Sequence, residues 1–144
     1  MIIKLTPPQI SEYWEVIKHA LIKGDLASDD HRLQVLNETL RALLNEKAQC
    51  FMRTTKEDRQ ILAVMITRLK ISDQSQDKFL FIQCLFSHAA VKNLEWQTDW
   101  NYILQFAKDE GCQYILTNSN NPRIYKLLNT LGVQEAFRSF QYFL

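Results

Sequence analysis

Three apolar segments follow one another in the centre of the chain, and they constrain the fold more than any other feature of the sequence. They cover residues 49–55, 61–71 and 78–86 and read QCFMRTT, ILAVMITRLKI and KFLFIQCLF. The segments are rich in apolar, β-branched and aromatic residues and are separated only by the polar stretches KEDRQ and SDQSQD. Strands joined by short polar turns pair with each other in antiparallel fashion. The sequence therefore predicts an antiparallel meander of three strands.

Helical patterns surround this meander on both sides. A short strand before Thr6 leads into a helix that begins at Pro7 and ends at Gly24, and a second helix begins after Ser28. The elements expected after the meander are a helix over 93–108, a strand over 114–117, a helix over 122–131 and a strand over 135–144. The expected order is therefore β-α-α-β-β-β-α-β-α-β.

This order predicts the fold class. A helix that connects two strands of one sheet makes those strands parallel, so segments 78–86 and 114–117 should form a parallel pair. The expected fold is α/β, with a mixed, mainly antiparallel sheet and helices on both faces. A crevice is expected where the parallel neighbours diverge at their carboxyl ends. Residues 1–144 contain no repeat, low-complexity tract or linker, which indicates one domain.

Composition and charge argue against several classes of function. Of the 144 residues, 47% are apolar and 23% are charged, and the net charge is +1 with Lys and Arg spread along the chain. No nucleic-acid surface is therefore expected. The longest apolar run, ILAVMI, is too short to cross a bilayer, and the N-terminal residues lack the apolar core of a signal peptide. We expect a cytoplasmic protein that does not contact membranes.

The cysteines and histidines show no metal-ligand pattern. Cys50, Cys84 and Cys112 are odd in number, widely spaced, and placed in or beside predicted strands. This placement predicts reduced thiols in the protein interior. The three histidines lack metal-ligand spacing as well, so no metal is expected.

The segment NPRIYKLLNTLGV carries a resemblance to a known family. Six of its residues fall at the specified positions of the pattern N-x-x-A-x-x-L-Y-x-x-x-G-F, namely Asn121, Ile124, Leu127, Leu128, Gly132 and Val133. The asparagine, the apolar pattern of the helix and the final glycine are kept. Together with the element order, this segment resembles the GNAT superfamily of N-acetyltransferases. The resemblance covers nearly the whole chain and implies a GNAT-like fold. It also implies transfer of an acetyl group from acetyl-CoA to an amine.

The cofactor loop of that family is altered here. In the family, an R/Q-x-x-G-x-G/A loop holds the pyrophosphate on backbone amides where the helix after strand four begins. The matching stretch is AAVKNLEW, which has Val91 at the Arg/Gln position and no glycine. Glu95 falls in the first helical turn, where its charge opposes a bound phosphate. The sequence thus predicts that no cofactor is bound. If the protein is active, the resemblance places acetyl-CoA against Phe86, Val91, Lys92, Asn93 and Asn121.

Three residues are candidates for proton transfer if the chemistry is retained. Leu128 stands where many family members have a tyrosine that protonates the CoA thiolate, so Tyr125 or Ser119 would have to serve as the acid. His88, at the end of a predicted strand, is the candidate general base, with water as the alternative. Each also has a structural interpretation: His88 as a surface or capping residue, Tyr125 as a packed ring, and Ser119 as part of a polar turn. Asn121, likewise, is either a cofactor contact or a turn residue that bonds the local backbone.

The last predicted strand is apolar on both faces. Phe137 and Phe143 fall on one face, and Phe140, Tyr142 and Leu144 fall on the other. An edge strand of this kind requires cover, either by a second subunit or protein partner or by burial within its own chain.

Two interpretations of function follow. In the first, the chain is a degenerate acetyltransferase-like protein that acts through protein interaction. Its NPRIYKLLNTLGV segment resembles small GNAT-like proteins of tailed phages, which implies a role in phage assembly or in the virion and a location there or in the host cytoplasm. In the second, it is an active N-acetyltransferase that uses acetyl-CoA to modify a small-molecule or protein amine. The amino-acid sequence favours the first.

Overall fold

The computed structural model describes residues 2–24, 31–88, 93–119 and 121–144, which form five strands and five helices. In chain order these are β1 Ile2–Lys4, α1 Pro7–Glu12, α2 Trp14–Gly24, α3 Arg32–Leu44, β2 Ala48–Thr54, β3 Ile61–Ile71, β4 Lys78–Ser87, α4 Asn93–Asp109, β5 Tyr114–Thr117 and α5 Pro122–Thr130. None of these described helices is long and apolar enough to cross a membrane.

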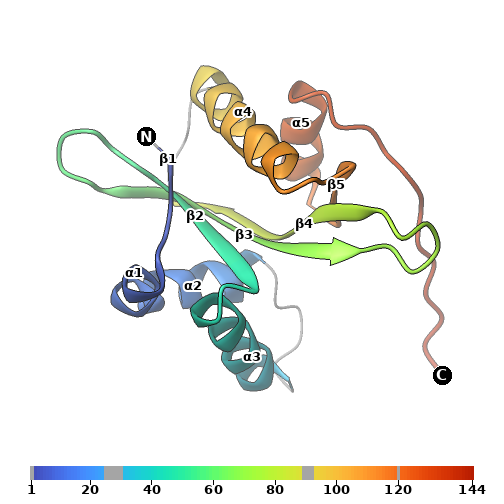
Figure 1. The fold of residues 1–144 in the computed structure, drawn as a ribbon, viewed down its shortest axis with the longest axis horizontal. Helices are drawn as coiled ribbons and strands as arrows, with labels where there is room; N and C mark the ends of the chain where they lie inside the picture. The colour runs from blue at the N-terminus through green and yellow to red at the C-terminus, as the bar shows by residue number, and fades with distance from the viewer. Residues whose placement is uncertain (1, 25–30, 89–92, 120) are drawn as a thin grey trace.

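The five strands form one sheet in the order β1-β2-β3-β4-β5 (Figure 1). Neighbouring strands are antiparallel except for β4 and β5, which run parallel and are connected through α4. The predicted meander and the predicted parallel pair are therefore confirmed. Their strand bounds agree with the sequence prediction to within one residue.

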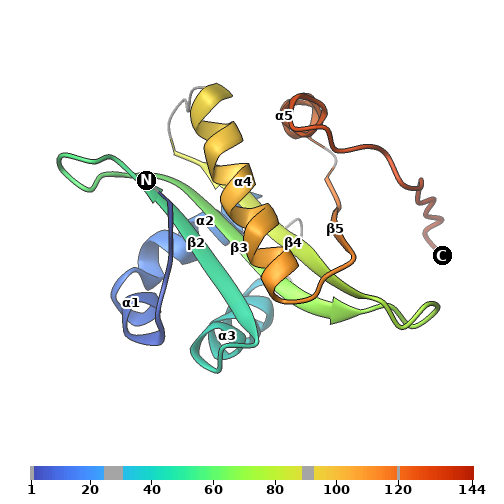
Figure 2. The same ribbon diagram turned by 45° about the horizontal axis from the view of Figure 1, so that its top comes forward.

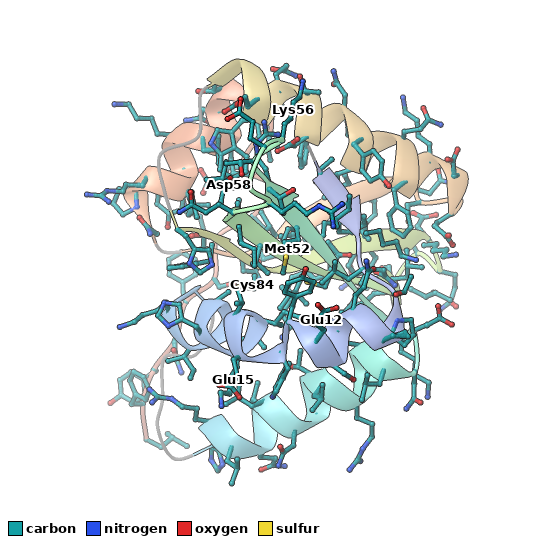
Figure 3. All side chains as sticks on the ribbon, turned by 90° about the vertical axis from the view of Figure 1, so that its left-hand side faces the viewer. Glu12, Glu15, Met52, Lys56, Asp58 and Cys84 are labelled. Atoms are coloured by element: carbon teal, nitrogen blue, oxygen red, sulfur yellow. The ribbon has the colours of Figure 1, made fainter. Side chains whose placement is uncertain are left out.

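Helices cover both faces of the sheet, as predicted. Helices α1, α2 and α3 lie on one face, and α4 and α5 lie on the other (Figures 1 and 2). Each layer has its own buried cluster of apolar side chains. Met52 and Cys84 lie in the cluster between the sheet and the N-terminal helices (Figure 3). Phe51, next to Met52 along β2, belongs to the cluster beneath α4, because successive strand residues point to opposite faces.

The predicted N-terminal helix over 7–24 is wrong in one respect, since the structure divides it in two. Tyr13 ends α1 with φ −97° and ψ 13°, and its backbone N–H donates to the carbonyl oxygen of Gln9 at 2.9 Å. Helix α2 begins directly after it at Trp14. The predicted start of the next helix at Ser28 lies outside the described residues, and α3 is described from Arg32.

The predicted strand over 135–144 is also wrong. Residues 133–144 form neither helix nor strand, and they lead away from the sheet (Figures 1 and 2). Beyond Val133, the described hydrogen bonds of this segment reduce to one contact, from Arg138 Nε to Glu135 Oε1 at 2.7 Å. A strand needs backbone partners on a neighbouring strand, and within one chain this segment does not run along a sheet edge. The alternating pattern of apolar residues alone does not produce a strand here.

Candidate functional site

Strand β5 ends before its neighbour β4 does. Their parallel pairing reaches Ile82 and Thr117, the last residue of β5, whereas β4 continues to Ser87. The carboxyl ends of parallel strands are where open α/β sheets bind ligands. The predicted crevice would lie at this end of the two strands.

A β-bulge in β4 lies at the same point. Gln83 is its extra residue, because the β3 partners of Ile82 and Cys84 are consecutive. Gln83 and Cys84 consequently point to the same face, where Gln83 Nε2 lies 3.3 Å from Thr39 Oγ1 of α3 and Cys84 packs in the cluster under α2. Ile82 and Leu85 point to the opposite face, toward α4. The bulge thus decides which β4 side chains line each side of the crevice.

An apolar cavity of about 30 Å³ lies on the α4 side of this crevice, between the sheet and helices α4 and α5. That volume holds about one or two water molecules. Leu127, Leu128 and Leu131 close it from α5 and its carboxyl end, while Trp96 and Trp100 close it from α4. The sheet contributes the remaining walls through Ile2, Phe51, Arg53, Ala63, Val64, Met65, Ile82 and Leu85.

A buried ion pair is the charged feature of this cavity. Arg53 Nη1 of β2 lies 2.5 Å from Asp99 Oδ1 of α4, and Arg53 Nη2 lies 3.1 Å from Glu95 Oε1 in the first turn of α4. The side chains of Arg53 and Asp99 are only 10% and 7% exposed. Arg53 Nε and Asp99 Oδ2 are buried without a hydrogen-bond partner among the described residues. The guanidinium is thus compensated by two carboxylates.

This pair was not among the predicted site residues, although the sequence contains a signal for it. Asp99 lies between Trp96 and Trp100 on the helix face that the periodicity assigns to the core. Arg53 interrupts an otherwise apolar strand. A charge on a buried face usually has a partner of opposite charge, so these two residues together indicate a buried ion pair.

The predicted base His88 lies on the other face of the sheet. Its ring stacks on His19 of α2 at 5.8 Å between centroids and contacts Phe86 edge-on at 4.9 Å. Its backbone N–H donates to Leu62 O at 2.7 Å. Burial disfavours the charged imidazolium and nearby His19 repels it, so the pKa of His88 is lowered from its usual range. Phe86, predicted as a cofactor contact, packs against the cluster under α2.

The predicted acids lie where β5 leads into α5, with Ser119 in the turn and Tyr125 in the helix. Tyr125 Oη donates to the backbone oxygen of Ser119 at 2.6 Å. Ser119 Oγ accepts from the backbone N–H of Asn121 at 3.1 Å, and Asn121 Oδ1 caps α5 by accepting from Arg123 N at 3.0 Å. None of the three predicted catalytic residues is among the described residues that line the cavity. Leu128, which stands where many members of the GNAT superfamily have a tyrosine, does line the cavity.

The other predicted site residues have less defined surroundings. Val91 and Lys92 lie outside the described residues, and Asn93 is the first residue of α4. The predicted interaction residues Phe137, Phe140, Tyr142, Phe143 and Leu144 are all exposed. All three cysteines are free thiols, as predicted; Cys50 and Cys84 are buried in the interior, whereas Cys112 is only half-buried. Within the described part of the chain, no group of three or more His, Cys, Asp or Glu residues is arranged to hold a metal ion.

Acetyltransferases of known structure share this architecture. A predicted acetyltransferase from Clostridium acetobutylicum, crystallised with acetyl-CoA, superposes with a TM-score of 0.72 at 14% identity, covering 99% of this chain and 94% of its own. The apo aminoglycoside 6'-N-acetyltransferase from Acinetobacter haemolyticus gives a TM-score of 0.71 at 14% identity, covering 100% and 97%. A ribosomal-protein-alanine N-acetyltransferase from Brucella melitensis gives 0.69 at 11% identity, covering 100% and 99%.

These similarities identify the fold. Neither a protein-family model nor a curated protein matches the sequence. The structural matches extend over the full chain, so the protein has the α/β fold of GNAT acetyltransferases, as the resemblance implied.

Proposed function

We propose that the protein is an N-acetyltransferase that takes its acetyl group from acetyl-CoA and binds the thioester arm in the crevice between β4 and β5. The observation that carries this proposal is the apolar cavity beside the point where the parallel pairing of β4 and β5 ends, at Ile82 and Thr117. The structural neighbour from Clostridium acetobutylicum, which was solved with acetyl-CoA, supports it.

The crevice suits one part of this ligand better than the other. Its apolar walls fit the pantetheine arm, but a cavity of about 30 Å³ is too small to admit that arm as it stands. Helix α5 has no buried residue, so outward movement of α5 is the least costly way to enlarge the space. The diphosphate finds no free positive charge in the described cavity, because Arg53 is paired with Glu95 and Asp99.

Side chains of this protein then serve as the base and the acid of the transfer. The amine nitrogen attacks the acetyl carbonyl carbon, the carbon–sulfur bond breaks, and the departing thiolate takes up a proton. His88, whose lowered pKa keeps it neutral near pH 7, or a water accepts the proton of the amine. Ser119 is better suited than Tyr125 as the acid. Its Oγ serves as an acceptor in the described turn, whereas the Tyr125 hydroxyl proton is already donated to the backbone.

Calorimetry with acetyl-CoA, and with CoA for comparison, tests the proposal. We expect a micromolar dissociation constant, about −8 kcal/mol, followed by release of free thiol when amines are supplied. Leu128→Trp should abolish binding by filling the cavity. The matched control Thr130→Trp adds the same side chain at an exposed position of α5 and should leave binding intact.

A second candidate function is favoured by two particular observations. The carboxylates of Glu95 and Asp99 lie in the first two turns of α4, where their charge opposes a bound phosphate. Leu128, which has no proton to donate, lines the cavity at the position where the resemblance implies a tyrosine. In this alternative the protein keeps the fold without the chemistry and acts through protein contacts, for example in phage assembly or in a virion. Absence of binding at millimolar acetyl-CoA would favour this second candidate.

A further inference from the structure

Two histidines that are far apart in the sequence lie next to each other on the α2 side of the sheet. His19 belongs to α2, and His88 directly follows β4. Their rings are nearly parallel, with 5.8 Å between centroids and 21° between planes. Both residues are exposed, so dissolved ions reach them from solvent. The expectation that no metal is bound was based on spacing along the chain, which does not detect a pair created by the packing of α2 on β4.

The backbone on both sides of this pair is held in place. Ala20, the neighbour of His19, is fully buried, and its carbonyl oxygen accepts from Cys84 Sγ of β4 at 3.4 Å. The backbone N–H of His88 donates to the carbonyl oxygen of Leu62 at 2.7 Å. Side chains carried by packed helices and strands are positioned more precisely than side chains on loops. The separation of the two imidazoles is therefore set by the fold.

The ring of Phe86 contacts both imidazoles. It meets His19 edge-on, with 5.7 Å between centroids and 81° between planes, and it meets His88 in the same way at 4.9 Å and 87°. Packing on one shared ring disfavours the χ1 rotamers that would carry either imidazole away. Two side chains that are already restricted lose less conformational entropy when they bind a common ligand.

The separation of the two rings suits a single metal ion between them. Neutral imidazole is a preferred ligand of Zn²⁺, Ni²⁺ and Cu²⁺. The zinc–nitrogen distance is about 2.0–2.1 Å, so two imidazoles on one ion have ring centroids on the order of 5–6 Å apart. The observed 5.8 Å falls in this range. The χ2 torsion of histidine is broad, so each exposed ring can turn a nitrogen toward the shared ion.

We propose that His19 and His88 form a two-histidine site for a divalent transition-metal ion of the zinc, nickel and copper group. Among the described residues, no group of three or more His, Cys, Asp or Glu residues could hold a metal ion, so water completes the coordination and the ion remains exchangeable. Mg²⁺ is a poor ligand for this site because it prefers oxygen donors. A bound ion also occupies the nitrogen with which His88 accepts a proton in the acetyl transfer. This last consequence rests on the proposed function, whereas the site itself does not.

Calorimetric titration of the untagged, full-length chain with NiCl₂ at neutral pH tests the proposal. All proteins carry Cys112→Ser, which removes a half-buried thiol as a competing ligand. We expect one ion per chain, and His19→Gln and His88→Gln should each weaken binding at least about tenfold, because a single imidazole loses the chelate effect. His31→Gln is the matched control, since His31 is also exposed but lies just before α3, and its affinity should equal that of the parent. Absence of Ni²⁺ binding by the parent, or full affinity in either single variant, would overturn the proposal.

The histidine ring signals in NMR spectra identify the ligands directly. With one equivalent of Zn²⁺, the signals of His19 and His88 should shift together, whereas the signals of His31 and a sample given MgCl₂ should not change. A shift of His88 without His19, or an equal shift of His31, would refute a shared ion. Neither experiment contains acetyl-CoA, so failure of the metal site is distinguishable from failure of the proposed function.

Discussion

Removal of Asp99 should destabilise the protein strongly, because it leaves the Arg53 guanidinium in the interior with a single, partly exposed partner. Breaking a buried ion pair costs about 3–5 kcal/mol, since the remaining charge stays desolvated. Glu95, whose side chain is 40% exposed, still pairs with Arg53 at 3.1 Å and reduces the loss. We therefore expect Asp99→Leu to lower the free energy of unfolding by about 3 kcal/mol.

The assay is urea unfolding followed by circular dichroism. At an m value of about 2 kcal/mol per molar urea, a loss of this size lowers the midpoint by about 1.5 M. Glu95→Gln is the comparison, because it removes the more exposed of the two partners and should cost at most about 1 kcal/mol. The m value should not change if both variants remain two-state.

The double variant Arg53→Met/Asp99→Leu is the more demanding test. It removes both charges, together with the two buried atoms Arg53 Nε and Asp99 Oδ2 that have no described partner. Replacement of a whole buried pair by apolar residues is often neutral or stabilising. We expect the double variant to be within about 1 kcal/mol of the wild type. If it proves less stable than Asp99→Leu alone, the energetic argument for this cavity is refuted.

Three further predictions concern other parts of the fold. Gly24→Ala should lower the free energy of unfolding by about 1 kcal/mol in thermal unfolding, because the new Cβ would lie 3.0 Å from Cys84 Sγ. The same substitution in a Cys84→Ala background should cost much less, and an equal cost in the two backgrounds would contradict the clash. Asn121→Ala removes the cap of α5, worth about 1 kcal/mol, and should appear as faster amide exchange within α5 rather than as a lower global midpoint, because α5 has no buried residue. The wild type should lose stability relative to His88→Gln as the pH falls below about 6.5. Burial and His19 lower the pKa of His88 in the folded state, so the unfolded chain binds the proton at a higher pH than the folded chain does. Parallel pH profiles would refute the last prediction.

The sequence predicts the sheet well because its signals there are local. Short polar turns fix the meander, and helix-stopping glycines fix the ends of two helices. Gly111 and Gly132 have φ values of +78° and +81°, a conformation that glycine adopts without steric cost. The helix crossover between segments 78–86 and 114–117 leads to the parallel pair, and the crevice follows from that pair.

What the sequence does not reveal depends on contacts between distant segments. Arg53 and Asp99 are 46 positions apart, and only the packing of α4 on β2 brings them together. The break at Tyr13 leaves the apolar spacing of the N-terminal helices nearly unchanged, so periodicity does not detect it. The tail over 135–144 has the composition of a strand, but its pairing depends on an edge that no local pattern specifies.

The bulge at Gln83 has a consequence for how this chain can vary in length. Deleting Gln83 itself would only remove the bulge and leave Cys84 and Leu85 on their present faces, whereas deleting or inserting one residue after it would turn the side chains that follow to the opposite face. Both clusters would change at once, so the second half of β4 should be intolerant of insertions and deletions. The exposed turn between β2 and β3, which contacts neither cluster through Lys56, Glu57 or Asp58, should accept them freely. Natural homologues should therefore differ in length at that turn, and a short tag inserted there should be tolerated. Along β4 they should differ in length only at the bulge.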